Sequence, residues 1–179
     1  HYVNIDGPWG LRLVAEPAQH VGPIIPMDRP WEGMGISVGT LLQENGKFRL
    51  WGGCQDPKGE RHICYFESTD GLHWSKPNLG LVEYAGNSAN NLIGFNIGLI
   101  FRDPAAPAEE RFKSVWHGDC DKKIFEDYKT RRPWSIMATE TDPGRAHAIL
   151  GAVSSDGYHW RNLEEPLSVE PSDTQIICE

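Results

Sequence analysis

The chain has 179 residues, the size of one domain, and its 17 basic and 25 acidic residues give a net charge of −8. This acidic balance, without a basic patch, argues against nucleic acid and anionic membranes as partners. No apolar run reaches the ~18 residues of a membrane-spanning helix, so we expect no membrane span. Seven Trp, 19 Gly and 13 Pro are typical of a turn-rich β-protein that buries aromatic rings.

The first predicted strand covers residues 33–42, which are rich in glycine and apolar residues. Glycine inside a strand suits crowding around an axis or the close approach of a ligand. Trp31 and Glu32 come directly before this strand, which we interpret as the inner strand of a repeat unit. Two readings stay open. Glu32 acts on a substrate while Trp31 stacks on a sugar ring, or Trp31 is a packing wedge and Glu32 a solvated charge.

Two more strands are predicted at 47–51 and 62–66. Cys54 and Cys64 flank the connection between them, so they can face each other across an antiparallel pair and form a disulfide. Free buried thiols are the alternative, and the state of all four cysteines stays open. They are Cys54, Cys64, Cys120 and Cys178, and their spacing matches no zinc motif.

The segment Ser68–Trp74 returns as Ser154–Trp160, with Ser, Asp, Gly, His and Trp at the same places. Each copy follows an apolar run, and Asp-Gly is a tight-turn dipeptide because Gly accepts positive φ and Asp bonds its own backbone. We therefore expect Asp70 and Asp156 to accept backbone N–H bonds in equivalent turns, with the next Trp starting a strand and burying its ring. Because a recurring residue serves every unit alike, neither Asp is predicted to be catalytic.

A second correspondence places Phe48–Trp51 before the first copy and Phe112–Trp116 before the second. The second unit is longer, so we expect an additional loop within Asp119–Arg145. Helix signals are weak, and the only helices predicted are short ones around Pro107–Arg111 and Lys122–Lys129.

Strand, Asp-Gly turn and Trp strand, repeated at the length of a blade, predict an all-β fold, a β-propeller. The repeat units cover about 32–74 and 90–160, and a third unit starts at about 173. Closed propellers need at least about four blades, and open sheet edges aggregate. We therefore expect residues 1–179 to be the N-terminal part of a single propeller domain. The remainder is expected in further C-terminal sequence or in another chain.

Six segments carry a resemblance to a known family: Arg29–Gly33, Asn45–Trp51, Ser68–Tyr84, Asn90-Asn91, Phe101–Pro107 and Ser155–Trp160. Together they resemble the glycosyl-hydrolase-like five-bladed β-propeller superfamily, which contains the invertases and levanases and the arabinanases and β-xylosidases. The similarity covers nearly the whole chain and is closest to a bacterial branch distant from the enzymes with known substrates. It implies five blades, of which this chain covers the first two and the start of a third.

Hydrolases of this superfamily place acids on the inner strands of successive blades, around a funnel. One acid protonates the leaving oxygen, and a second carboxylate attacks the anomeric carbon or activates water. The resemblance implies these roles for Glu32 and Asp173, which hold corresponding places before units one and three. Substrate contacts are predicted at Trp31, Asn90, Asn91, Asp28 and His117. Asn90 and Asn91 stand where unit two would need an acid, and an amide binds hydroxyls without transferring a proton productively.

The tripeptide Arg102-Asp103-Pro104 matches a motif that opens an inner strand in invertase-like enzymes. Here it follows the predicted strand 96–101, and the next strand begins near Arg111. Asp-Pro followed by Pro107 is ordinary turn chemistry, so we interpret Asp103 as a turn residue.

The predicted function is a secreted or periplasmic glycoside hydrolase that cleaves a poly- or oligosaccharide. A non-catalytic propeller that binds glycans or a partner is the alternative, and a polysaccharide lyase is a third reading. Two carboxyls about 5–10 Å apart in the funnel favour the enzyme, whereas a funnel lined by Asn, Trp and Gly favours the binder. We expect a carbohydrate substrate, no cofactor and no metal ligands among the site residues, with a structural calcium ion left open.

Overall fold

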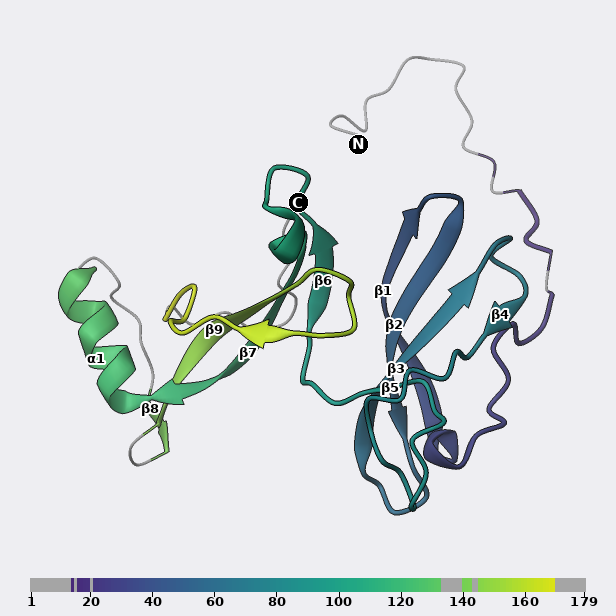
Figure 1. Ribbon diagram of the computed structural model, residues 1–179, viewed down its shortest axis with the longest axis horizontal. Coiled ribbons are helices and arrows are strands. Elements are labelled where there is room, and N and C mark those ends of the chain that lie inside the picture. Colours follow the sequence, from purple (N-terminus) through teal and green to yellow (C-terminus); the bar gives the residue numbers. More distant parts are fainter. Residues whose placement is uncertain (1–13, 15, 20, 133–139, 143–144, 170–179) are drawn as a thin grey trace.

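The computed structural model describes residues 14, 16–19, 21–132, 140–142 and 145–169. They form two antiparallel β-sheets that lie side by side, connected by residues 94–98, which form neither helix nor strand (Figure 1). The chain is therefore an all-β protein, as the sequence predicts.

The first sheet is a meander with the strand order β1-β2-β3-β4, and β5 pairs with the far part of β3. A 3₁₀ turn, η1, leads into it at Pro30–Glu32. Its strands are β1 (Gly35–Glu44), β2 (Lys47–Gln55), β3 (Arg61–Ser68), β4 (Trp74–Ser75) and β5 (Leu92–Ile93). The tight turn between β1 and β2 places Asn45 and Gly46 at positive φ, which Asn and Gly tolerate best.

The second sheet has the order β10-β9-β7-β6, with β8 paired to β9. A 3₁₀ turn, η2 (Ala108–Glu110), joins its first two strands. The strands are β6 (Leu99–Arg102), β7 (Phe112–Asp121), β8 (Glu140–Asp142), β9 (Arg145–Ser154) and β10 (Arg161–Asn162). In chain order, β6, β7, β9 and β10 thus repeat the meander of β1 to β4.

The register of the paired strands supports the equivalence of the two meanders. Phe48 on β2 pairs with Ser68 on β3, and Phe112 on β7 pairs with Ser154 on β9. Both serines stand at the end of their strand, directly before the repeated Asp-Gly turn. The two copies of the sequence repeat therefore connect the third and fourth strands of two matching sheets.

The two Asp-Gly turns have the same hydrogen bonds, which confirms the prediction. Asp70 Oδ1 accepts from the backbone N–H groups of Leu72 and His73, both at 2.8 Å. Asp156 Oδ1 accepts from the corresponding groups of Tyr158 and His159, at 2.8 and 2.9 Å. Each Gly has positive φ, at 75° and 82°.

The tryptophans that follow these turns differ from expectation. Trp74 and Trp160 are half-buried rather than buried. Each indole N–H folds back onto the turn and donates to the carbonyl of its Gly, at 3.0 and 3.1 Å. The ring is therefore fixed over the turn that precedes it.

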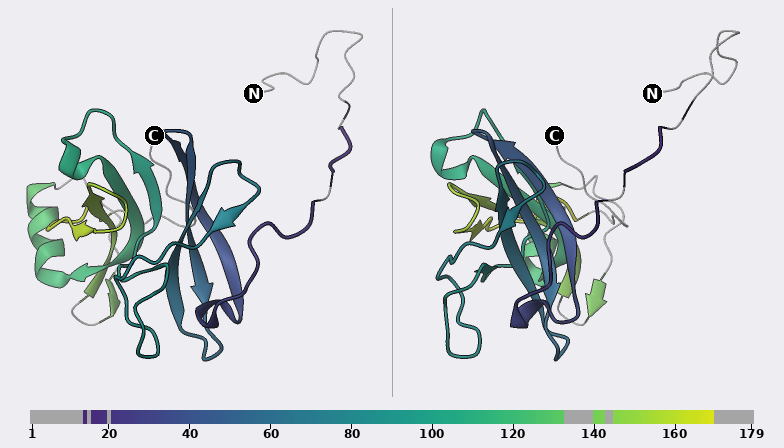
Figure 2. Two further views of the ribbon diagram at one scale, coloured as in Figure 1. Left: turned by 45° about the vertical axis from the view of Figure 1, so that its right-hand side comes forward. Right: turned by 90° about the vertical axis from the view of Figure 1, so that its right-hand side faces the viewer.

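The additional loop of the second unit is present where the sequence predicts it. It contains α1 (Lys122–Arg131), which Asp121 caps by accepting from the backbone N–H of Lys123 at 2.8 Å. Phe125 and Tyr128 are the buried residues of this helix, and they pack against the second sheet on the side away from the first sheet (Figure 2). The described residues include no helix with the length and apolar character needed to cross a membrane.

An aromatic core joins the two sheets. It contains Trp51 and Tyr65 from the first sheet and Ile100 and Phe112 from the second. Arg49 lies among these rings, and its guanidinium carbon is 4.8 Å from the ring centroid of Trp51 and 4.9 Å from that of Phe112. Burial of several large rings is the main favourable term between the sheets.

Candidate functional site

An open groove of about 850 Å³ lies at one end of the first sheet. In an antiparallel meander, the start of the first strand, the end of the second and the start of the third meet at one end. Here these are Gly35–Ser37, Gly53–Gln55 and Arg61–Ile63, and residues 92–96 close the groove from the side of β5. The volume lies within the ~300–1,000 Å³ typical of ligand pockets.

A disulfide underlies the groove. Cys54 on β2 and Cys64 on β3 are bonded, with their Cα atoms 6.2 Å apart, which resolves the alternative left open by the sequence. Gly53 lets Ser37 of β1 approach β2 closely, because a Cβ at Gly53 would lie 2.6 Å from Ser37 Oγ. The disulfide therefore cross-links the two strands that form the floor, whereas Cys120 is buried in the second sheet.

Polar and aromatic side chains converge on the groove. Arg61 and Asn96 are exposed, and Gln55, His62 and Phe95 are half-buried. Phe95 also packs edge-on against Trp116 of the second sheet, with ring centroids 6.4 Å apart. The groove therefore offers donors, acceptors and one aromatic face that the neighbouring sheet supports.

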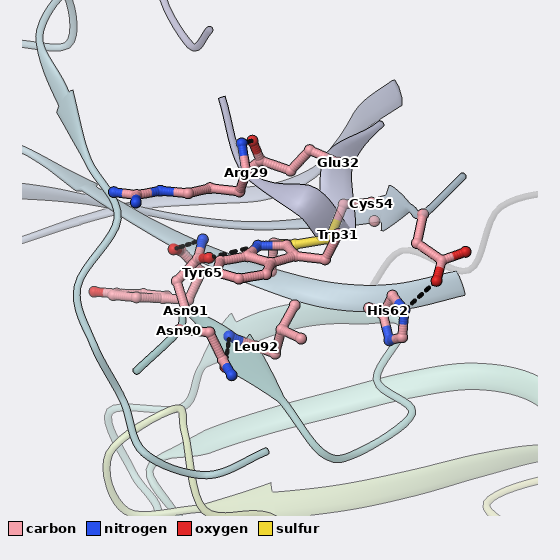
Figure 3. Close-up of a disulfide and its surroundings, with 12 residues drawn as sticks. Arg29, Trp31, Glu32, Cys54, His62, Tyr65, Asn90, Asn91 and Leu92 are labelled. Carbon is pink, nitrogen blue, oxygen red and sulfur yellow. Dashed lines mark hydrogen bonds and ion pairs between the residues drawn. A yellow bond between two sulfur atoms is a disulfide. The ribbon is translucent and has the colours of Figure 1, made fainter. Parts of the chain in front are cut away.

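Trp31, Asn90 and Asn91 are buried behind the groove. Trp31 Nε1 donates to Asn91 Oδ1 at 2.9 Å, and Asn91 Nδ2 donates to the carbonyl of Tyr65 at 2.9 Å (Figure 3). Asn90 Oδ1 accepts from the backbone of Leu92, and its Nδ2 donates to the carbonyl of Val82. Their polar atoms tie β5 and η1 to β3, so the packing-wedge reading of Trp31 matches its surroundings.

Glu32 is completely buried and paired with Lys76. Its Oε2 lies 2.6 Å from Lys76 Nζ and also accepts from the backbone N–H groups of Asp28 and Arg29, each at 3.1 Å. Its Oε1 is buried and has no hydrogen-bond partner among the described residues. Glu32 is therefore not a solvated charge, and its catalytic role stays a prediction.

The remaining predicted site residues lie apart from the groove or outside the described residues. The exposed Asp28 carboxylate is 2.7 Å from Lys76 Nζ, and this lysine holds its pKa below the ordinary value. His117 is half-buried on β7, next to the ring of His147 with centroids 5.3 Å apart. Asp173, the second predicted acid, lies outside the described residues. Asp103 occupies the turn between β6 and β7, where its Oδ1 accepts from Ala105 N, as interpreted from the sequence.

Sequence reasoning missed a cluster at the rim of the groove. Asp56, Glu60 and His62 each offer a ligand atom, and these atoms lie within 4.8 Å of one another. Asp56 starts the turn between β2 and β3, and its Oδ1 accepts from the backbone of Lys58 and Glu60, both at 2.9 Å. The run Asp56–Gly59 indicates this turn in the sequence, but it does not indicate that Asp56 is buried and accepts from Tyr84, 28 residues further along the chain.

The turn keeps the Asp56 carboxylate ionised. Burial raises its pKa, but the hydrogen bonds from the backbone of Glu60 and Lys58 outweigh this and hold the pKa below the ordinary value. Tyr84 Oη also donates to Asp56 Oδ2, at 3.2 Å. The rim of the groove therefore carries a fixed negative charge.

Comparison with protein-family models, with curated proteins and with solved structures gives no match to this chain. The chemistry of the groove is therefore argued from its own residues.

Proposed function

We propose that this protein is part of a five-bladed β-propeller that binds carbohydrate in the groove of its first sheet. The observation that carries the proposal is the repetition of one four-stranded meander, with the same Asp-Gly turn between its third and fourth strands. Successive four-stranded sheets packed face to face are the building units of propellers. A ring of five needs further sheets beside these two.

The groove residues suit a sugar. Arg61, Gln55 and Asn96 carry planar groups that donate or accept several hydrogen bonds, as sugar hydroxyls require. Phe95 offers a ring for the apolar face of a pyranose or furanose, supported from behind by Trp116. An open groove that combines these groups fits a segment of a glycan chain better than a small enclosed metabolite.

We further propose that hydrolysis of glycosidic bonds depends on Glu32 together with an acid from outside the described residues, with Asp173 as the candidate. Oε1 of Glu32 has no hydrogen-bond partner among the described residues, and this favours a catalytic role for Glu32. In a purely structural ion pair, both oxygens of a buried carboxylate would be expected to accept hydrogen bonds. Movement of η1 would be needed to bring Glu32 to a substrate, because its side chain has no exposed surface.

A location outside the cytoplasm, secreted or periplasmic, is part of the proposal. The Cys54–Cys64 disulfide supports it, because disulfides persist in oxidising compartments and are rare in the cytosol. The acidic net charge of −8 agrees with the expectation of no nucleic-acid partner.

Binding is tested by calorimetry against a panel of soluble poly- and oligosaccharides, with wild type, Phe95→Ala and Arg61→Ala. Truncation of a central binding residue costs ~1–2 kcal/mol or more, so each variant should bind a responsive glycan at least ~5–30-fold more weakly. Lys113→Ala is the control, because Lys113 lies on β7, does not line the groove and has long ion pairs, at 3.8 and 3.9 Å, with described residues. Equal affinity of all four proteins for the glycan would reject the groove.

Catalysis is tested separately by release of reducing ends from the glycan that binds best. Loss of a general acid or base lowers turnover by at least ~10²-fold, which is the result expected for Glu32→Gln and for Asp173→Asn. Unchanged turnover in both variants would remove these residues from the mechanism. Binding without any turnover in wild type would leave a glycan-binding propeller.

A further inference from the structure

The turn between β2 and β3 assembles three side chains that are common metal ligands. His62 Nε2 lies 4.0 Å from Asp56 Oδ2, and a carboxylate oxygen of Glu60 completes a group whose atoms lie within 4.8 Å of one another. Asp56 is buried, His62 is half-buried and Glu60 is exposed. The group therefore lies at the surface, on the rim of the groove, with one side open to solvent.

His62 Nε2 is buried and lacks a hydrogen-bond partner within the part of the chain that the structure describes. Buried polar atoms nearly always have a hydrogen-bond partner, and one that lacks it destabilises the fold unless another ligand satisfies it. The 4.0 Å between this nitrogen and the Asp56 carboxylate is too long for a hydrogen bond, but the gap suits an ion that contacts both groups.

The distance between His62 Nε2 and Asp56 Oδ2 is close to that expected between two ligand atoms of one metal ion. Zinc binds imidazole nitrogen at ~2.0–2.1 Å and carboxylate oxygen at ~2.0–2.2 Å, which puts two tetrahedral ligand atoms roughly 3.4 Å apart. The 4.0 Å between His62 Nε2 and Asp56 Oδ2 therefore needs a closure of only about half an ångström. Exposed Glu60 has the freedom to adjust to the third position.

The surroundings hold two of the ligands in place. Asp56 Oδ1 is fixed by two backbone N–H bonds, and its Oδ2 accepts from Tyr84 Oη, which leaves a lone pair of Oδ2 for a metal. The ring of Tyr84 also packs edge-on against His62, with centroids 5.6 Å apart. His62 pairs in register with Cys54, which the disulfide ties to β3. Such outer contacts orient metal ligands and tune their affinity.

We propose that Asp56, Glu60 and His62 bind a divalent transition-metal ion, with Zn²⁺ as the best match. The imidazole ligand favours zinc over calcium or magnesium, which prefer oxygen ligands alone. Three protein ligands leave a fourth position, which faces solvent at the groove rim and would hold water or a ligand hydroxyl. The metal site does not require that the groove binds carbohydrate.

The test is titration of the metal-free 179-residue protein with ZnCl₂ by calorimetry, with the bound metal counted by mass spectrometry. Wild type should bind one Zn²⁺ per chain. His62→Ala should lower the affinity by at least ~10-fold, and Glu60→Ala should do so without affecting the fold, because Glu60 is exposed. Asp56→Asn keeps Oδ1, which accepts the two backbone N–H bonds, but replaces the ligand atom Oδ2 by an NH₂ group, so the variant should fold and bind Zn²⁺ more weakly.

His73→Ala is the matched control, because His73 also faces an aspartate, with its Nδ1 2.6 Å from Asp70 Oδ2, but at a turn between other strands. It should bind Zn²⁺ as wild type does. The proposal is overturned if wild type binds no stoichiometric Zn²⁺, or if His62→Ala binds it as well as His73→Ala does. Urea unfolding of each metal-free variant separates lost ligation from lost folding.

Discussion

The two Asp-Gly turns are nearly identical in sequence and hydrogen bonding, yet their surroundings differ. The Asp70 turn faces solvent, with the side chain of His73 89% exposed. The Asp156 turn is inserted against the first sheet, where the carbonyl of Asp156 accepts from Arg49 and that of Gly157 accepts from Trp51 Nε1 at 2.8 Å. Local sequence therefore determines the turn, whereas the neighbouring sheet determines what the turn contributes to stability.

Among the described residues, the side chains that bind the Asp156 turn, Arg49 and Trp51, belong to the first sheet, and the second sheet has no equivalent pair. Arg49 and Trp51 hold the second and fourth positions of the segment that begins at Phe48. In the second sheet these positions, counted from Phe112, are held by Lys113 and Val115. The Asp-Gly turn of the second sheet thus binds a strand of the first sheet, whereas the turn of the first sheet has no such contact with the described residues at the equivalent positions of the second. This asymmetry can be tested.

The largest effect is expected for Arg49→Ala. This buried guanidinium bonds Tyr65 Oη at 2.9 Å and Glu44 at 3.2 Å besides the turn, and its loss leaves these buried groups short of a partner. Removal of one partner from a buried charged pair costs about 3–5 kcal/mol. The free energy of unfolding, measured by urea denaturation, should fall by that amount.

Lys113→Ala is the matched variant in the second sheet. Its ion pairs with Asp103 and Glu110 are long, at 3.8 and 3.9 Å, so the expected loss is under about 1 kcal/mol. Equal losses for Arg49→Ala and Lys113→Ala would mean that the docked turn contributes nothing to the contact between the sheets.

A loss of nearly the same size is expected for Lys76→Met. The Glu32 side chain has no exposed surface, and the Lys76 side chain is only 6% exposed, so the variant leaves a buried carboxylate without its cation. The expected cost is about 3 kcal/mol or more. Arg161→Met breaks an ion pair of similar length, 2.7 Å to Glu110, but this arginine is 64% exposed, and the loss should stay below about 1 kcal/mol. Comparable urea midpoints for the two variants would contradict the structural role of the Glu32–Lys76 pair.

A smaller effect is expected from removal of the disulfide in the double variant Cys54→Ser/Cys64→Ser. The disulfide closes a short loop in the first sheet, and by the chain-entropy model such a cross-link stabilises by about 2–3 kcal/mol. Because the cross-link joins β2 to β3, its loss should act first on the first sheet. Hydrogen exchange of wild type and of this variant measures the effect. Protection should fall in β2 and β3 but not in β7 and β9, and a uniform decrease would show that both sheets unfold as one unit.

The smallest effect is a difference in acid and salt response between the two turns. Hydrogen bonds from the backbone and ring of His73 lower the pKa of Asp70. Burial raises the pKa of Asp156, but bonds from His159 outweigh this and bring it to about 2. Because both pKa values lie below the ordinary ~3.9, the ionised turns stabilise the fold above about pH 4 and lose this contribution as the pH falls toward 2.

Urea unfolding between pH 5 and pH 2 should therefore show a shallower decline in Asp70→Asn and in Asp156→Asn than in wild type. High salt should weaken the contribution of Asp70 more, because its turn faces solvent and exposed charges are screened. An equal salt response of the two variants would argue that docking does not shield the Asp156 turn.

Much of the local structure could be predicted from the sequence. The repeat located both Asp-Gly turns, the additional loop and the turn at Asp103, because these depend on neighbouring residues and on glycine conformation. The half-burial of Trp74 and Trp160 was not predicted, because the fold-back of each indole onto a glycine carbonyl competes with burial in a core.

The candidate site was harder to predict. The sequence predicts site roles for Trp31 and Glu32 but does not indicate their buried contacts with Asn91 and Lys76, which lie 60 and 44 residues away. The groove residues and the Asp56–His62 cluster carry no motif, so no spacing indicates them. Their proximity results from strand register and from the packing of Tyr84 over the turn.

By itself, the sequence determined the all-β class, the repeated Asp-Gly turns and the position of the inserted helix, because short-range hydrogen bonds and the periodicity of apolar residues are written along the chain. Only the tertiary structure decided that Cys54 and Cys64 bond, that Glu32 is sealed by Lys76, and that the second turn docks on Arg49. These outcomes depend on which distant surfaces exclude water together, and burial sets the energy of each charge and hydrogen bond.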